Sequence, residues 1–189
     1  MRRYLFSYAG WKRFGIKVAK DSKEFDSRWE NWCVAYHGTA GENASKILTS
    51  GLKVSTQGCF YEKEVPRVYV SPSIEYSGHP RYARPWKQVK RNGETCWYQL
   101  VFQCRVNPES IDTVGPETLV HNQYKTTTVV DKNFTNNELE WVILGKGNEQ
   151  FITRDIVCYG LMMRISPDDP KSLPPSTWWK RSLWADTYA

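Results

Sequence analysis

The stretch TCWYQLVFQCRV, residues 95–106, constrains the fold of this chain more than any other segment. It is the longest run of strand-forming residues, and it contains neither Gly nor Pro to interrupt an extended backbone. Apolar side chains fall on both faces of such a strand, which is typical of a strand that is covered on both sides. We therefore expect residues 95–106 to form the central strand of a sheet.

Further strands are expected before and after this segment. They are rich in β-branched and aromatic residues and are bounded by turn signals; their expected ranges are 12–18, 33–39, 67–71, 137–144 and 151–165. Because several strands come late and only short helices come early, the order of elements indicates an α+β domain.

Two helices are expected in the first 50 residues. Asp21 or Ser22 can cap the first helix, and its apolar side chains recur on one face at Phe25, Trp29 and Trp32. The second helix covers 42–50 and ends at Gly51, a residue suited to a helix C-terminus; its expected inward side chains are Ala44, Ile47 and Leu48.

Composition excludes several classes of protein. No stretch approaches the roughly 18 apolar residues of a membrane span, and the N-terminus does not read as a signal peptide. The five cysteines contain no C-x-x-C pair, which indicates reduced thiols and an intracellular protein, cytoplasmic or nuclear. The three histidines complete no zinc-binding spacing, so we expect no metal.

Positive charge is unevenly distributed along the chain. The net charge is +6, and residues 81–91 (RYARPWKQVKR) hold five Lys or Arg with aromatic residues between them. This pattern fits a surface that grips nucleic acid through phosphates and stacking. It fits equally a solvated basic face, or a rim that attracts a phosphate-bearing ligand.

Three polar residues stand in or at the ends of separate expected strands: His37, Tyr69 and Glu140. Such residues can line a cleft between two sheets. Each one alone, however, is commonly just a hydrogen-bonded polar residue or a core residue. Glu138 and Glu140 stand two apart, so in a strand both would point to one face, about 6–7 Å apart. An acid within a buried strand usually marks a functional site.

Three blocks in this order, HGTAGENASKILTSGLKV, VYVSPSIEYSGHPRYA and NNELEWVIL, together resemble the catalytic domain of PARP-like ADP-ribosyltransferases of the diphtheria-toxin type, the H-Y-E group. The resemblance runs from about Trp32 to Ile165. It implies an ADP-ribosyltransferase fold, in which two packed, mostly antiparallel sheets with short flanking helices surround a cleft for NAD. It also implies three parts: an N-terminal extension (1–31, strand plus short helix) packing on the domain, the catalytic domain (32–165), and a Pro- and Trp-rich tail (166–189).

The resemblance implies a role for each matched residue. The catalytic set is Glu140, His37 and Tyr69, with Glu140 holding the nicotinamide ribose and favouring positive charge at the anomeric carbon. The NAD-binding set is His37, Gly38, Thr39, Asn43, Tyr69, Ser77 and Tyr82. Tyr82 is favoured over Tyr76 as the second tyrosine beside the nicotinamide, since Tyr76 stands where many members of the family carry Lys. Glu138 is a possible acceptor-side residue, as in the arginine-directed members of the wider group.

The implied activity is that of an NAD⁺ ADP-ribosyltransferase, a pentosyl-type glycosyltransferase. It would transfer single ADP-ribose units from NAD, its co-substrate, to a macromolecule and release nicotinamide. We expect a protein acceptor rather than nucleic acid, no membrane partner, and a monomeric domain of a larger protein. Two alternatives remain open: an inactive module of the same fold that binds NAD, ADP-ribose or a protein partner, and a nucleic-acid-directed ADP-ribosyltransferase.

Overall fold

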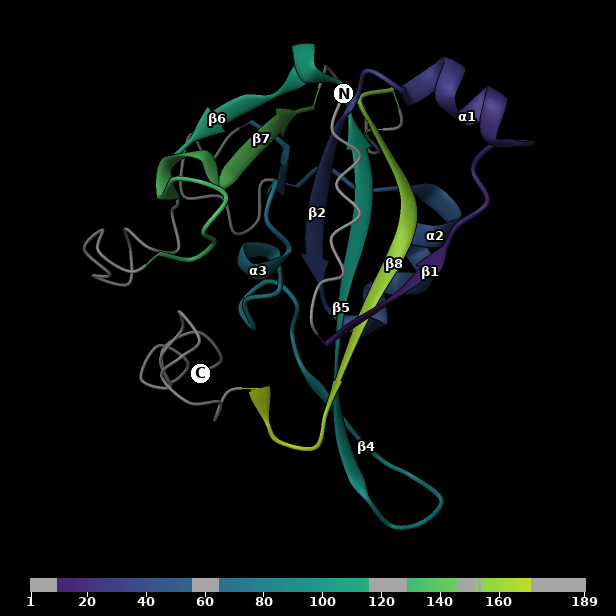
Figure 1. Ribbon diagram of the computed structural model, residues 1–189, viewed down its shortest axis with the longest axis vertical. Coiled ribbons are helices and arrows are strands. Elements are labelled where there is room, and N and C mark those ends of the chain that lie inside the picture. Colours follow the sequence, from purple (N-terminus) through teal and green to yellow (C-terminus); the bar gives the residue numbers. More distant parts are fainter. Residues whose placement is uncertain (1–9, 56–64, 116–128, 146–151, 153, 171–189) are drawn as a thin grey trace.

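The computed structural model describes residues 10–55, 65–115, 129–145, 152 and 154–170. Over these residues the protein is an α+β domain with two antiparallel sheets and a few short helices, as the order of elements predicts (Figure 1). The strands are β1 (Trp11–Gly15), β2 (Cys33–Thr39), β3 (Arg67–Val70), β4 (Trp86–Val89), β5 (Thr95–Val106), β6 (Asp112–Val114), β7 (Glu140–Leu144) and β8 (Ile156–Ser166). The α-helices are α1 (Ser22–Trp29), α2 (Ala44–Ser50) and α3 (Ile74–Ser77), and the 3₁₀ helices are η1 (Gly41–Asn43), η2 (Pro108–Ser110) and η3 (Asn136–Glu138).

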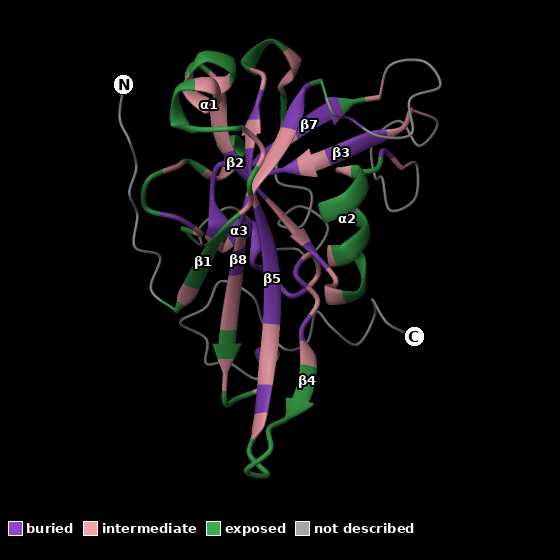
Figure 2. Ribbon diagram, turned by 90° about the vertical axis from the view of Figure 1, so that its right-hand side faces the viewer, coloured by how far each residue is buried: buried purple, intermediate pink, exposed green. Residues whose placement is uncertain are grey.

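Strand β5 is the central strand of the larger sheet, as predicted. The order is β1-β8-β5-β2, and β4 pairs with the N-terminal part of β5. Leu100 and Phe102 of β5 are buried in the main hydrophobic core, while Val101 packs in a second core cluster on the opposite face. The middle of β5 is therefore covered on both faces (Figure 2).

The smaller sheet has the order β3-β7-β6, and one bridge joins it to the larger sheet. The backbone N–H groups of Tyr36 and Ser71 each donate to the other residue's carbonyl, at 2.7 and 2.9 Å. Because Tyr36 lies in the middle of β2 and Ser71 directly follows β3, this bridge sets the middle of β2 beside the C-terminal end of β3. Because the bridge is antiparallel, the residue after Tyr36 on β2, His37, lies beside residues that precede Ser71 on β3, and its Nδ1 atom contacts the Tyr69 carbonyl.

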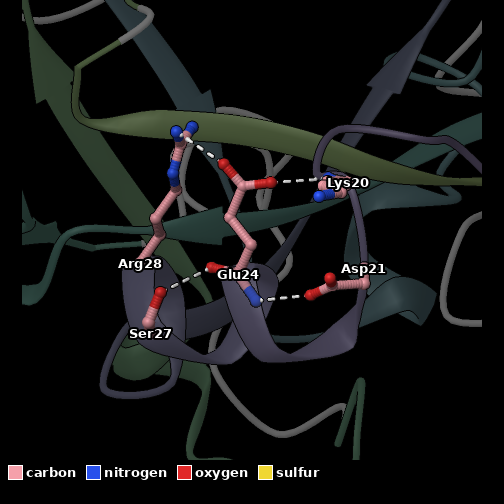
Figure 3. A network of polar contacts seen from close by, with 5 residues as sticks. All are labelled: Lys20, Asp21, Glu24, Ser27 and Arg28. Atoms are coloured by element: carbon pink, nitrogen blue, oxygen red, sulfur yellow. Dashed lines mark hydrogen bonds and ion pairs between the residues drawn. The ribbon is translucent and has the colours of Figure 1, made fainter.

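The N-terminal elements pack against the larger sheet. Strand β1 pairs with β8 along its whole length and forms an edge of the sheet. Helix α1 begins with a reciprocal cap: the Glu24 N–H donates to Asp21 Oδ1 at 2.9 Å, and the Lys20 N–H donates to Glu24 Oε2 at 2.6 Å (Figure 3). Glu24 also pairs with Arg28, one turn later. The predicted cap at Asp21 is confirmed. It gives a hydrogen-bond acceptor to a backbone N–H group of the first turn, which has no partner within the helix.

Strand β4 and the first residues of β5 form a hairpin that projects beyond the body of the domain (Figure 1). Residues 87–94 are all exposed (Figure 2). The ring of Trp86 stacks on that of Tyr98 at the base of the hairpin, with centroids 5.6 Å apart. Part of the basic stretch 81–91 therefore lies on this arm, and the remainder lies nearer the body.

Several predicted boundaries and faces are wrong. The strand expected at 12–18 is Trp11–Gly15, and the last strand begins at Ile156 rather than at 151. Helix α1 ends at Trp29, so Trp32 does not belong to its apolar face. Leu48 is 49% exposed although it was expected to point inward. A helix of only seven residues presents one narrow stripe to the core, and Ile47 occupies it.

Two further expectations concern the cysteines and the C-terminus. The four cysteines in the described part of the chain are free thiols; Cys59 lies outside it. Most of the predicted tail, 171–189, also lies outside the described residues. Within the described residues, no helix has the length and apolar character needed to cross a membrane.

Candidate functional site

A cleft of about 340 Å³ opens where the two sheets meet. The three residues predicted as the catalytic set all line it, and each comes from a different strand: His37 from β2, Tyr69 from β3 and Glu140 from β7. Pairing of β3 with β7 and the bridge between β2 and the end of β3 bring these strands together. The fold thus brings together three residues, the first and last of which are 103 positions apart in the sequence.

Glu140 is the first residue of β7 and is only 2% exposed. Its Oε2 atom accepts a hydrogen bond from the Tyr76 hydroxyl, and the Tyr82 hydroxyl lies 3.4 Å from the same oxygen. A buried carboxylate is costly unless hydrogen bonds compensate it, and the two tyrosines supply that compensation. The carboxylate is therefore held at the wall of the cleft by side chains from a single preceding segment.

Tyr76 and Tyr82 form a hydrogen-bonded pair. Their hydroxyl oxygens are 3.2 Å apart and their ring centroids 5.5 Å apart. Burial raises the pKa of Tyr76, and the neighbouring Tyr82 and Glu140 raise it further. Tyr76 is consequently a neutral donor to Glu140, and the single hydroxyl proton of Tyr82 lies within reach of both Glu140 Oε2 and the Tyr76 oxygen.

Tyr76 is the site residue that sequence reasoning missed. Tyr82 was favoured as the second tyrosine of the cleft, but both residues line it and Tyr76 makes the shorter contact with Glu140. Helix α3 is a single turn whose Ser73 cap holds the Tyr76 N–H at 3.2 Å. The Ser73 hydroxyl in turn donates to buried Asp131, at 2.8 Å. No periodicity over so short a helix could have indicated which side chain faces the cleft.

The His37 ring is oriented by the backbone of β3. Its Nδ1 atom lies 2.8 Å from the Tyr69 carbonyl oxygen, which can only accept, so Nδ1 carries the proton. Burial lowers the pKa of His37, an effect that the hydrogen bond to Tyr69 partly opposes. In its neutral form the ring therefore has an acceptor at Nε2, suited to a ligand hydroxyl group.

Gly38 lies against the segment that follows α3. A Cβ atom at this position would be 2.1 Å from the Ser77 carbonyl oxygen and 2.9 Å from the Ala83 backbone nitrogen. Only glycine allows this approach. The Ser77 hydroxyl donates to the Tyr36 carbonyl at 2.8 Å, so toward the cleft it offers a hydrogen-bond acceptor.

A second, shallower hollow adjoins the cleft. It shares His37, Gly38, Arg81 and Tyr82 with the cleft, and it contains the remaining predicted NAD-binding residues, Thr39 and Asn43. The Asn43 side-chain amide lies 3.5 Å from the Thr39 hydroxyl, with which it makes a long hydrogen bond. All seven residues of the predicted NAD-binding set therefore line one of two connected hollows.

Glu138 does not share a strand face with Glu140. It ends the 3₁₀ helix η3, is exposed, and lines a different surface hollow from the cleft. Its Oε2 atom accepts from the Thr135 N–H at 2.8 Å and from the Thr135 hydroxyl at 2.7 Å. The prediction of two acids on one strand face is wrong, because this capping box begins a helical turn. The sequence signal was present: Thr135-Asn136-Asn137-Glu138 is the T-x-x-E pattern of a capping box.

The cleft carries more positive than negative charge. Lys53, Arg67 and Arg81 line it, and Glu140 is its only acid among the described residues. On charge alone, Lys63 and Arg67 are candidates to contact a phosphate group, and Lys63 lies outside the described part of the chain. The balance of charge suits an anionic ligand that places a hydroxyl group or a cationic centre near Glu140.

The geometry of the two hollows is the main source of functional information for this protein. Over the described residues, no group of three or more His, Cys, Asp or Glu side chains is arranged to hold a metal ion. No protein-family model matches the sequence.

Proposed function

We propose that the protein is an NAD-dependent ADP-ribosyltransferase that attaches single ADP-ribose units to a macromolecular acceptor, with protein favoured over nucleic acid. The observation that carries this proposal is the meeting of buried Glu140 with His37 and Tyr69 in one cleft between two sheets. The resemblance in sequence implies a joint catalytic role for the same three residues. The ADP-ribosyltransferase fold itself is part of the proposal; the α+β architecture is compatible with it.

Glu140 would act on the ribose that is attached to nicotinamide. Its carboxylate accepts a hydrogen bond from the ribose 2′-hydroxyl and favours positive charge at C1′. The bond between C1′ and the nicotinamide nitrogen then breaks, and its electron pair leaves with nicotinamide. The acceptor nucleophile forms a new bond to C1′ from the opposite face and loses its proton to the solvent or to a base.

The other residues would bind and orient NAD. His37 Nε2 accepts from a hydroxyl of the adenine ribose. The Ser77 hydroxyl accepts from the carboxamide NH₂ of nicotinamide beside the Gly38 backbone. Tyr69 gives the nicotinamide ring an aromatic surface for offset stacking. The roles of His37 and Ser77 use the acceptor atoms that their internal hydrogen bonds leave toward the cleft.

One observation supports the alternative of a binding module without activity. Oε2 of Glu140 already has two tyrosine hydroxyls around it, at Tyr76 and Tyr82. If these contacts persist when NAD binds, the carboxylate is less available to the ribose. The protein would then bind NAD or ADP-ribose without cleaving NAD.

A single assay separates the two functions. The chain is incubated with NAD, released nicotinamide is measured by chromatography, and the intact mass of the chain is measured for attached ADP-ribose. For Glu140→Gln we expect at least a hundredfold slower release, because the carboxylate charge is lost while the shape is kept. Glu109→Gln is the matched control, since Glu109 is exposed in η2 and does not line the cleft.

Each outcome decides between the functions. Nicotinamide release that depends on Glu140 supports the transferase. Release that is equal in wild type and Glu140→Gln contradicts the mechanism. The binding module is supported instead if calorimetry shows that NAD binds but no nicotinamide is released. This must hold whether the ADP-ribose acceptor on offer is water, the chain itself or an added polypeptide.

A further inference from the structure

Arg81 occupies the junction between the cleft and the shallower hollow. It is one of four residues that line both, together with His37, Gly38 and Tyr82. A ligand long enough to fill both hollows must therefore pass beside its side chain. Among these four shared residues, Arg81 is the only permanently charged one.

The charges on either side of the junction favour an anion at that point. Glu140 lies in the cleft alone, and the shallower hollow contains no acidic lining residue among those described. The second cation of the shallower hollow, Arg84, does not line the cleft. Arg81 is thus the cation best placed to meet a negative group that links two ligand halves.

The segment that carries Arg81, residues 78–83, is held by several hydrogen bonds. Its N–H donates to His79 Nδ1 at 3.0 Å, and the His79 carbonyl accepts from the N–H groups of Tyr82 and Ala83 at 2.8 and 2.9 Å. Buried Gln99 donates through Nε2 to the carbonyls of Gly78 and Ala83, at 3.0 and 2.8 Å. The segment 78–83 is consequently fixed on the sheet before any ligand binds, which lowers the entropic cost of binding.

His79 remains neutral beside this arginine. Burial and the nearby Arg81 charge lower the pKa of His79 to about 3. Its Nδ1 atom serves as an acceptor for the backbone, so the imidazole orders the loop without adding a second charge. One guanidinium group at the junction is the chemistry that suits a diphosphate, because its fork of N–H donors matches two phosphate oxygens.

We infer that Arg81 binds the diphosphate of a dinucleotide whose two halves occupy the cleft and the adjoining hollow. The inference rests on the proposed function and adds the residue that would select a diphosphate-linked ligand over a nucleoside. It also gives part of the basic stretch 81–91 a role in ligand binding, distinct from that of the exposed hairpin.

The test uses calorimetric titration of the whole chain with adenosine, AMP, ADP and ADP-ribose, independently of any turnover. For Arg81→Gln we expect the affinity for ADP and ADP-ribose to fall about ten- to a hundredfold, the range for a lost charge-assisted contact, with adenosine changed less than twofold. Arg81→Lys should retain part of the affinity, since it keeps the charge and loses the fork. Lys87→Gln, on the exposed arm, removes the same charge and should change ADP affinity less than twofold.

The outcomes distinguish this inference from the proposed function. Equal losses for ADP in Arg81→Gln and Lys87→Gln, or an equal loss for adenosine and ADP, would overturn the role of Arg81, even if nicotinamide is still released from NAD. Conversely, an Arg81-dependent affinity for ADP without nicotinamide release would support the diphosphate site and contradict the transferase. Thermal unfolding of each variant checks that the segment 78–83 has kept its fold, and Arg81→Lys supplies the answer if Arg81→Gln unfolds.

Discussion

The Tyr76 hydroxyl donates a hydrogen bond to Oε2 of Glu140, and both side chains are buried at the wall of the cleft. This contact joins α3 of one chain segment to β7 of another, 64 positions later. It makes the orientation of the candidate catalytic carboxylate depend on a helix of one turn. Changes in and around that helix should therefore affect both stability and activity.

Tyr76→Phe removes the hydroxyl and keeps the ring. A hydrogen bond to a charged group contributes about 1.5–3 kcal/mol, so we expect a loss of that size in the free energy of unfolding, measured with urea. Nicotinamide release should also slow, because the carboxylate loses its nearest donor. Tyr82→Phe is the comparison: its hydroxyl is 3.4 Å from Glu140, and its removal should cost less stability. Equal effects of the two variants would show that Tyr76 has no special role.

Gly38→Ala tests the close approach of β2 to the segment after α3. The new methyl group would meet backbone atoms of Ser77 and Ala83, which cannot turn aside as a flexible side chain can. We expect a loss of about 1–3 kcal/mol or more in the free energy of unfolding, together with weaker NAD binding. Gly115→Ala is the matched control, since a Cβ atom there meets no atom within 4 Å. A Gly38 variant as stable as that control would contradict the observed packing.

His79 predicts a dependence of stability on pH. In the folded protein its pKa is about 3, against 6.5 for the ordinary group, so between these values the unfolded chain binds the extra proton. Stability from this residue is complete above pH 6.5 and falls with decreasing pH. Between pH 7.5 and 4.5 the loss should be roughly 2–3 kcal/mol.

His79→Asn checks the source of this dependence. Asparagine can still accept from the Arg81 N–H through its side-chain oxygen, but it does not titrate. Urea unfolding at pH 7.5 and 4.5 should give a flatter profile for the variant than for wild type, whatever its absolute stability. Parallel profiles would mean that another group causes the loss. The lowered pKa of His37 acts in the same direction and remains in both proteins.

Gln99→Met should loosen the segment that carries Arg81 and Tyr82. The methionine has a similar size but cannot donate to the carbonyls of Gly78 and Ala83 or accept from Arg164. Each buried carbonyl left without a donor costs about 1–3 kcal/mol. We expect lower stability and a higher KM for NAD. Gln88→Met, on the exposed arm, should leave both unchanged, and equal behaviour of the two variants would contradict the role of Gln99.

Much of the secondary structure follows from local patterns. The ranges of β2 and β5 agree with those predicted, because both segments are rich in apolar residues and are bounded by turn signals. The cap at Asp21 and the end of α2 at Gly51, where φ is +83°, also follow from local chemistry. Weaker alternation gave poorer boundaries for β1 and β8.

The site could be predicted only in part. His37, Tyr69 and Glu140 were identified from their order in the chain, and the structure places them in one cleft. Glu138 was assigned to the strand although the capping box at Thr135 begins a helical turn instead. The period-two pattern predicts a strand over these residues, but the hydrogen bonds of the capping box stabilise a helical turn there instead.

The sequence by itself determined most of the secondary-structure elements and supplied the candidate residues for the proposed function, because periodicity, turn residues and caps act over a few positions. Only the tertiary structure decided which side chains meet: Tyr76 with Glu140, His37 with the Tyr69 carbonyl, and Arg81 with both hollows. These contacts depend on how the two sheets pack and on the direction in which the one-turn helix α3 presents its side chains. They are set by burial and hydrogen-bond satisfaction across distant segments, which no local pattern in the chain records.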